Sequence, residues 1–408
     1  MLKDFYLDHK EILNKILLVL GLIMIYILTI NTEEFLENKG PLAKKIELNN
    51  MVVSGYKKGK LSWLIKSKYV WSSYNLDHAN LENIYEGTLY DNGKIVLKDL
   101  AARKVRTNAP QERLTALGGV IATLIREVNT ETHYVNVWAE DLSYFSSDKK
   151  TYLSKSVKLK DNDIYINADK AMIDHQTNEV FIKNGFTIKK SLSDIKGNKL
   201  NMKIDSQDFI AEENVVLNRK GQEKNENTLK KENTKITCAK LTMKIADNLA
   251  TAKFYGDIKI WQPDKQGFAN KALFNEKNDT LTLQNNAVLI FDKSDWLIDK
   301  ETISKLKNQE IKKSIQEKLT LRGDTINIST KTKNFNAVGN VKVLLKEKEA
   351  KAGNAIYDKE KETITLTNEV WLKNKDNSWV KANLVKVLVD KEEFIAEDQV
   401  ETKIFLKR

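Results

Sequence analysis

The sequence contains few of the residues that build disulfide frameworks, metal sites or rigid turns. One cysteine among 408 residues excludes an intramolecular disulfide framework and a cysteine-rich metal site. Three prolines and sixteen glycines leave most turns to Asn, Asp and Ser. The four histidines are scattered, with no cysteine or carboxylate partner at the spacing of a metal site. We therefore predict no metal and no cofactor.

Catalytic and nucleic-acid-binding patterns are also missing. The chain has no glycine-rich phosphate loop and no G-x-S-x-G, and carboxylates such as Asp174, Asp205 and Asp358 are best interpreted as turn formers. The formal net charge of +11 favours anionic partners, but Lys alternates with Glu and Asp along the chain. Clustered basic residues with exposed aromatics, which nucleic-acid binding needs, are not found. We expect neither an enzyme nor a nucleic-acid-binding protein.

One long apolar run stands near the N-terminus, at residues 16–30. It covers roughly 22 Å as a helix against a ~30 Å hydrocarbon core, and Lys15 can make up part of the difference by snorkelling. The alternative, a cleaved signal peptide, lacks its small-residue cleavage pattern. We predict an uncleaved transmembrane anchor whose membrane-embedded side chains are Ile16, Leu17, Leu18, Val19, Leu20, Leu22, Ile23, Ile25, Ile27 and Leu28.

The charges that flank this run predict its orientation. Three lysines precede it and three glutamates follow it: Lys3, Lys10, Lys15, Glu33, Glu34 and Glu37. Positive charge marks the cytoplasmic side. We therefore expect residues 1–15 to form a cytoplasmic tail and residues 31–45 a linker, with everything from about residue 46 across the membrane.

The rest of the chain repeats with a period of 29 or 30 residues. Short β-branched and aromatic runs alternate with breaks at Asn, Asp or Gly, which is the pattern of strands and turns. The apolar residue after each break recurs at Val120, Val157, Phe186, Val215, Ile258, Val288, Val341, Val370 and Val400, and five of the eight intervals are 29 or 30. The two longest intervals contain polar insertions at 221–235 and 300–318. The second insertion has the spacing of a short amphipathic helix.

A second position confirms this phase. Eighteen residues before each apolar position stand Ala102, Ala139, Ala168, Gly197, Lys240, Asn270, Gly323, Ala352 and Ala382, of which seven are Ala or Gly. A small residue at a fixed phase indicates close approach of another backbone or a tight bend. Each unit is then two strands joined by a polar turn, and stacked units form an elongated all-β body.

Together, the anchor and the repeats, as in YINADKAMIDHQTNEVFIKNGFTI, resemble the lipopolysaccharide-export bridge proteins. Residues 46–161 are similar to the LptC type, through GKLSWLIKS at 59–67, LENI at 81–84, YDNG at 90–93 and LTALGGV at 114–120. Residues 162–408 are similar to the LptA/OstA-like type. The resemblance implies a curled β-jellyroll, open along one side, that receives lipopolysaccharide from an inner-membrane ABC transporter. It also implies location at the inner membrane with the body in the periplasm.

Alternation within the strands predicts the lipid-contacting face. Side chains two apart point the same way, so one apolar face is made by Val157, Leu159, Val180, Ile182, Phe186, Ile188, Val215, Leu217, Ile258, Ile260, Leu281, Leu283, Val341, Val343, Ile364 and Leu366. Each acyl CH₂ buried there would gain about 0.8 kcal/mol. The residues alone do not distinguish an open groove from a dry, closed core.

The two ends of such a body present unpaired strands. Residues near Leu48–Val53 form the expected inner edge, and the C-terminal edge, with Val400, Ile404 and Leu406, is the expected contact for LptA-like or outer-membrane components. If each unit gives one strand to each face, the body is on the order of 40 Å long. The alternatives are an anchored structural or adhesin-like scaffold without lipid cargo, and a carrier of a different envelope lipid.

Overall fold

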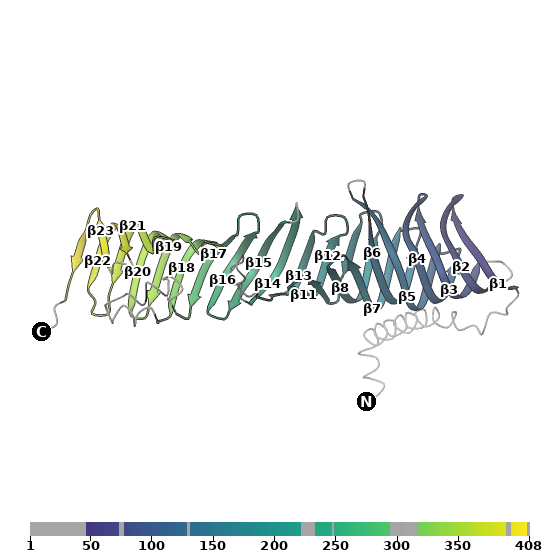
Figure 1. The fold of residues 1–408 in the computed structure, drawn as a ribbon, viewed down its shortest axis with the longest axis horizontal. Coiled ribbons are helices and arrows are strands. Elements are labelled where there is room, and N and C mark those ends of the chain that lie inside the picture. The colour runs from purple at the N-terminus through teal and green to yellow at the C-terminus, as the bar shows by residue number, and fades with distance from the viewer. Residues whose placement is uncertain are drawn as a thin grey trace, which may run out of the picture.

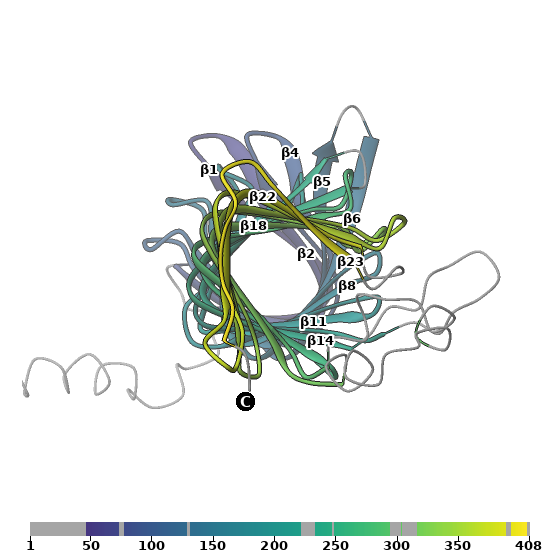
Figure 2. The same ribbon diagram turned by 90° about the vertical axis from the view of Figure 1, so that its left-hand side faces the viewer.

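The structure is a computed structural model that describes residues 46–72, 77–128, 131–221, 233–246, 249–293, 303, 316–388 and 393–405. These residues form one elongated all-β body with β1 at one end and β24 near the other (Figure 1). Viewed down the long axis, the strands curl around a common centre (Figure 2). The prediction of an elongated all-β fold is confirmed.

Within the described residues, twenty-four strands join into one sheet in which neighbouring strands are antiparallel. The first twelve are β1 (Ile46–Lys57), β2 (Lys60–Ser72), β3 (His78–Asp91), β4 (Lys94–Asn108), β5 (Arg113–Val128), β6 (Glu131–Phe145), β7 (Lys150–Asp161), β8 (Ile164–Asp174), β9 (Glu179–Ile182), β10 (Phe186–Lys190), β11 (Ser193–Gly197) and β12 (Lys199–Lys203). The others are β13 (Phe209–Arg219), β14 (Thr234–Ala246), β15 (Leu249–Gln262), β16 (Lys265–Asn275), β17 (Thr280–Phe291), β18 (Leu319–Ser329), β19 (Phe335–Leu345), β20 (Lys348–Asp358), β21 (Thr363–Lys373), β22 (Trp379–Leu388), β23 (Glu393–Glu397) and β24 (Glu401–Lys403).

Most strands bend at a corner near their middle, where the pairing register shifts. In β19 the shift lies between Val338 and Val341, and the intervening Gly339 and Asn340 have φ of 77° and 48°. In β17 the corner residues are Asn285 and Asn286, also left-handed. Two consecutive left-handed residues form a bulge that turns the strand, and Gly and Asn adopt this conformation at the lowest cost. The predicted breaks are therefore corners within strands.

The repeating apolar residue follows the corner directly, and the repeating small residue lies opposite it. Val341 pairs with Ala352, Val370 pairs with Ala382, and Ala168 pairs with both Val157 and Phe186. These side chains are buried except for the half-buried Ala168. A small neighbour leaves room for the apolar side chain where the strands bend. In the pair of Ala168 with Phe186, the small and the apolar residue stand at the predicted spacing of eighteen residues.

In three units the small-beside-apolar pair does not lie at the predicted positions. Opposite Val215 lies Cys238 and not Lys240, and opposite Ile258 lies Ala269 and not Asn270, because the corners shift the register there. In β17 the buried residue after the corner is Ala287, which pairs with Gly323, and not Val288. The chain thus keeps the small-beside-apolar pairing but places it one or two residues earlier.

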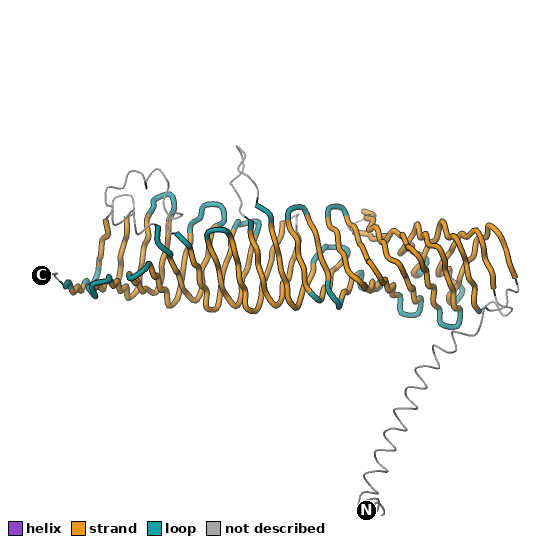
Figure 3. The backbone as a smooth tube through the Cα atoms, turned by 90° about the horizontal axis from the view of Figure 1, so that it is seen from below, coloured by secondary structure: helices purple, strands orange, loops and turns teal. Residues whose placement is uncertain are grey.

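Successive turns alternate between the two ends of the strands, so they form two rows along the body. We call the row containing turns 57–60, 91–94, 161–164, 190–193 and 345–348 the first rim. The row containing turns 108–113, 145–150, 174–179, 203–209 and 358–363 is the second rim. The chain runs back and forth between these rows along the long axis (Figure 3). Since most strands bend at a corner, the two rims are brought toward each other and border the open side of the roll.

This arrangement makes the expected length too short. Each bent strand contributes one segment to each of the two faces. The prediction of about 40 Å instead assumed that a two-strand unit adds only one strand to each face. The pairs β9 with β10, β11 with β12 and β23 with β24 each follow one bent path, which leaves 21 paths. At about 4.8 Å per strand the body is on the order of 100 Å long.

Several predicted segments lie wholly or mostly outside the described residues. They are the tail, anchor and linker at 1–45, most of the insertions at 221–235 and 300–318, and Leu406. The first insertion ends earlier than predicted, because β14 already begins at Thr234. In the part of the chain that is described, no helix has the length and hydropathy needed to cross a bilayer.

Candidate functional site

The inner face of the roll is a continuous apolar surface. Buried hydrophobic side chains, with half-buried ones packed against them, form one apolar cluster on this face. All sixteen side chains predicted to face inward belong to the cluster, and twelve of them are buried. The other four, Leu217, Leu281, Val343 and Ile364, are half-buried and pack against it. Strand alternation thus placed these residues on one face; that they contact lipid stays a prediction.

The roll is closed in its first half. From β5 to β12 the inward apolar residues are buried right up to the strand ends, as Leu159 and Ile164 at the first rim and Ile173 and Met202 near the second rim illustrate. Side chains from the two faces therefore interdigitate here. A lipid chain entering this half would have to separate them.

Polar contacts between the rims hold this half together. Lys57 on the first rim donates a hydrogen bond to the Ser146 carbonyl at 2.6 Å, and its Nζ lies 2.9 Å from a Glu112 carboxylate oxygen. Lys149 on the second rim pairs with Asp91 on the first at 3.0 Å. A straight twelve-residue strand would be about 40 Å long, so these contacts require the strands to curl until their ends meet.

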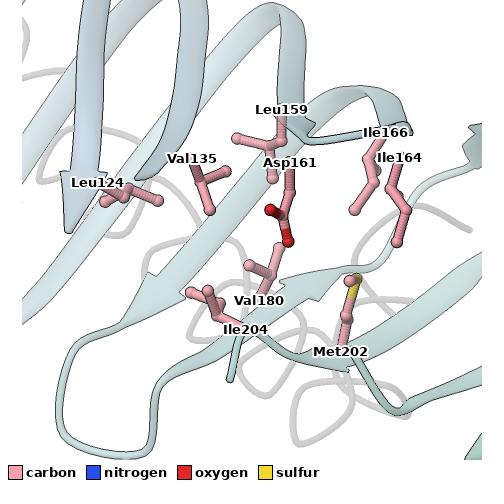
Figure 4. Close-up of a pocket in the computed structure, with 9 residues that line it drawn as sticks. All are labelled: Leu124, Val135, Leu159, Asp161, Ile164, Ile166, Val180, Met202 and Ile204. Atoms are coloured by element: carbon pink, nitrogen blue, oxygen red, sulfur yellow. The ribbon is translucent and has the colours of Figure 1, made fainter. Parts of the chain in front are cut away.

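A small cavity lies in the closed half, among strands β5–β9 and β12. Its volume is about 20 Å³, enough for one water molecule. Figure 4 shows the Asp161 carboxylate directed into it among eight apolar side chains. Asp161 is only 6% exposed and accepts a hydrogen bond of 2.8 Å from the Gln207 side chain. Because Asp161 ends β7 at the first rim and Gln207 lies on the second, this contact also crosses between the rims.

The roll changes character after β12. In β13–β22 the inward residues next to the corners stay buried, but many nearer the rims are only half-buried: Leu217, Ile236, Leu281, Ile328, Val343, Leu345, Ile364, Leu372 and Val387. Polar contacts near the rims here join turns of the same rim, as between Lys346 and Glu317 or Lys375 and Glu347. An apolar strip therefore follows the open side of the second half, which suits the chains of a lipid.

A histidine on the second rim links folding to pH. The His175 Nε2 lies 2.8 Å from Thr151 Oγ1, and its ring packs edge-on against Tyr144. Burial lowers the pKa of His175 from 6.5 to about 4, against the opposing charges of Asp174 and Asp91. Burial likewise raises the pKa of Tyr144 to about 12, and its hydroxyl donates to the Tyr90 carbonyl across the rims at 3.3 Å.

We expect acid to weaken the closed half through His175. Below pH 6.5 the unfolded chain binds a proton that the folded chain takes up only near pH 4, so stability falls as the pH drops through this window. The loss should reach about 2–3 kcal/mol. Urea unfolding of the wild type and of His175→Gln at pH 7 and pH 4.5 isolates this contribution from that of the carboxylates. Equal losses in the two proteins would contradict it.

At each end of the sheet the last strand has one edge without a partner among the described residues, and both edges carry exposed apolar side chains. Of the described strands, β1 pairs only with β2, and β23 and β24 pair only with β22. Val400 is 50% exposed and Ile404 is 67% exposed, together with Phe394 and Phe405 on the same edge. Val400 occupies the corner between β23 and β24, where its counterparts in earlier units are buried by the following strand. Among the described residues, none covers the predicted partner edge.

The cross-rim residues were not identified from the sequence. Lys57, Asp91, Glu112 and Lys149 stand in turns that are up to 92 residues apart in the chain. Charged turn residues are common, so their identity carried no signal. Only the alternation of turns between the two rims, once the units are aligned, would have placed them near one another.

Comparison with known families agrees with this geometry. The family described as LptA/(LptD N-terminal domain) LPS transport protein matches residues 165–310 and 313–393, more than half of the chain. The match begins in β8 and runs to β23, so it includes the whole half-buried apolar strip. No curated protein matches the chain. The chain belongs to the LptA/LptD N-terminal family of lipopolysaccharide transport proteins.

Proposed function

We propose that this chain is a membrane-anchored bridge component, with no catalytic activity of its own, that carries lipopolysaccharide across the periplasm. Residues 16–30 anchor it in the inner membrane with the N-terminus in the cytoplasm. Residues 46–161 act as an LptC-type module that accepts the lipid from an ABC transporter, and residues 162–408 act as the LptA-type extension. Any ATP is used by the transporter.

One observation carries this proposal: the apolar inner face runs unbroken from the first module into the repeats and comes to line an open side there. Acyl chains placed along it would leave a bilayer without facing water, at a gain of about 0.8 kcal/mol per CH₂. The saccharide would stay outside the rims in water. A scaffold without cargo needs no such half-buried apolar strip along an open side.

In-cell photocrosslinking tests the proposal. Benzoyl-phenylalanine at Ile182 and Val343, which face inward, should give lipopolysaccharide adducts. At the neighbouring Lys183 and Lys342, which lie outside the apolar cluster, it should give none. Adducts with proteins only would favour the structural scaffold, and adducts with a different lipid at Ile182 and Val343 would favour the alternative cargo.

A further inference from the structure

A second, larger cavity lies where the two rims meet in the first module. Its volume is about 240 Å³. Residues of the turns 57–60 and 91–94 of the first rim and of the turn 145–150 of the second rim line it, together with Leu61, Ser62 and Tyr144. It differs from the apolar interior, because most of the residues that line it are charged or polar and it includes the Lys57 and Lys149 contacts between the rims described above.

The charge around this cavity is predominantly positive. Four lysines line it, Lys57, Lys58, Lys60 and Lys149, against one carboxylate, Asp91. Lys57 and Lys149 are engaged in the cross-rim contacts to Glu112 and Asp91. Lys58 and Lys60 are exposed, and neither makes an ion pair within the described part of the chain. Two ammonium groups are therefore left over after the internal pairing.

The turn that carries these two lysines is well defined. Lys58 and Gly59 both have left-handed φ, 47° and 75°, and they connect β1 to β2 as a tight hairpin whose ends pair at Lys57 and Lys60. Such a turn fixes the backbone positions of Lys58 and Lys60 relative to each other. Lysine ammonium groups bind phosphate as point charges, and a phosphomonoester carries about −1.5 to −2 charge near neutral pH, which matches two lysines.

We propose that this cavity binds a phosphoryl group through Lys58 and Lys60. For a lipid bound by the roll, the phosphoryl group would be that of its head group, and this part of the inference rests on the proposed function. Free phosphate has the same chemistry and could occupy the site without any lipid. Lys57, Asp91 and Lys149 also line the cavity. An anion held there would therefore lie beside the ion pairs that join the two rims of the first module.

The test uses the full chain in a neutral glycoside detergent at fixed ionic strength, with three probes. Inorganic phosphate, titrated by calorimetry, reports on the cavity alone. A short-chain diacylglycerol, followed by native mass spectrometry, reports on the apolar face alone, and phosphatidic acid with the same chains reports on both. The variant is Lys58→Gln/Lys60→Gln. Its control, Lys331→Gln/Lys333→Gln, removes the same charge from an exposed turn between β18 and β19.

We expect phosphatidic acid to bind at least tenfold more tightly than diacylglycerol, equivalent to about 1.4 kcal/mol. The Lys58/Lys60 variant should lose this advantage while the control keeps it. Phosphate binding that disappears in the same variant, without an advantage for the phosphorylated lipid, would assign the site to the free anion. Equal binding of the two lipids with no phosphate binding, or equal loss in variant and control, would overturn the proposal. Failure of diacylglycerol alone to bind would count against the apolar face as a lipid site and not against the phosphoryl site.

Discussion

Removal of residues 396–408 should abolish binding of the chain to the next component of the bridge. The deletion removes β24 and the end of β23, and with them Val400, Ile404 and Phe405, which form most of the exposed apolar edge. An incoming strand would lose both the backbone groups and the apolar side chains to which it pairs. Co-purification of the partner with the full-length and truncated chains measures the effect, and binding to the inner-membrane transporter should be unchanged.

A variant that keeps the whole chain separates edge pairing from folding. Phe394 and Ile404 are 57% and 67% exposed, so Phe394→Lys/Ile404→Lys should not alter the free energy of unfolding by more than about 0.5 kcal/mol. Lysines on an edge strand oppose strand addition because pairing would bury their charge. Co-purification should fall as in the truncated chain. Undiminished binding by both proteins would place the contact elsewhere.

The repeat could be predicted because its two signals are local and physical. A bulge needs residues that tolerate left-handed φ, and the strand beyond it needs an apolar side chain facing a small one. Val341, which directly follows a corner and pairs with Ala352, meets both requirements, and equivalent residues recur at a fixed spacing. The Asn92–Gly93 turn between β3 and β4, with φ of 48° and 84°, was predictable for the same reason.

The closure of the roll could not be predicted, because it depends on contacts between distant turns. Leu159 and Val343 follow the same pattern after their corners, yet Leu159 is buried and Val343 is only half-buried. The difference arises from rim contacts such as Lys57 with Glu112 and Asp161 with Gln207, which local alternation does not encode. The length of the body could not be predicted for the same reason. Only the register between paired strands shows that one bent strand contributes to both faces.

Filling the interior at one repeat should stop transport through the whole chain. Ala337 is fully buried and pairs with Ala355 on β20 and Ile326 on β18, so its side chain lies on the inner face. In Ala337→Phe the ring would occupy the space that acyl chains need, at a folding cost of about 1–3 kcal/mol. We expect loss of lipopolysaccharide export in cells that depend on this chain. Asn336→Phe is the matched control, because Asn336 is exposed and precedes Ala337 directly.

The position of the block also tests the direction of flow. If lipid passes from the first module toward the C-terminal edge, photocrosslinks at Ile182, in β9, should persist in Ala337→Phe because lipid still enters upstream. Photocrosslinks at Leu366, in β21, should fall more than tenfold because the block lies between them. Urea unfolding distinguishes this from global destabilisation, which would reduce both adducts together. Retained adducts at Leu366 would mean that lipid does not travel along the inner face at Ala337.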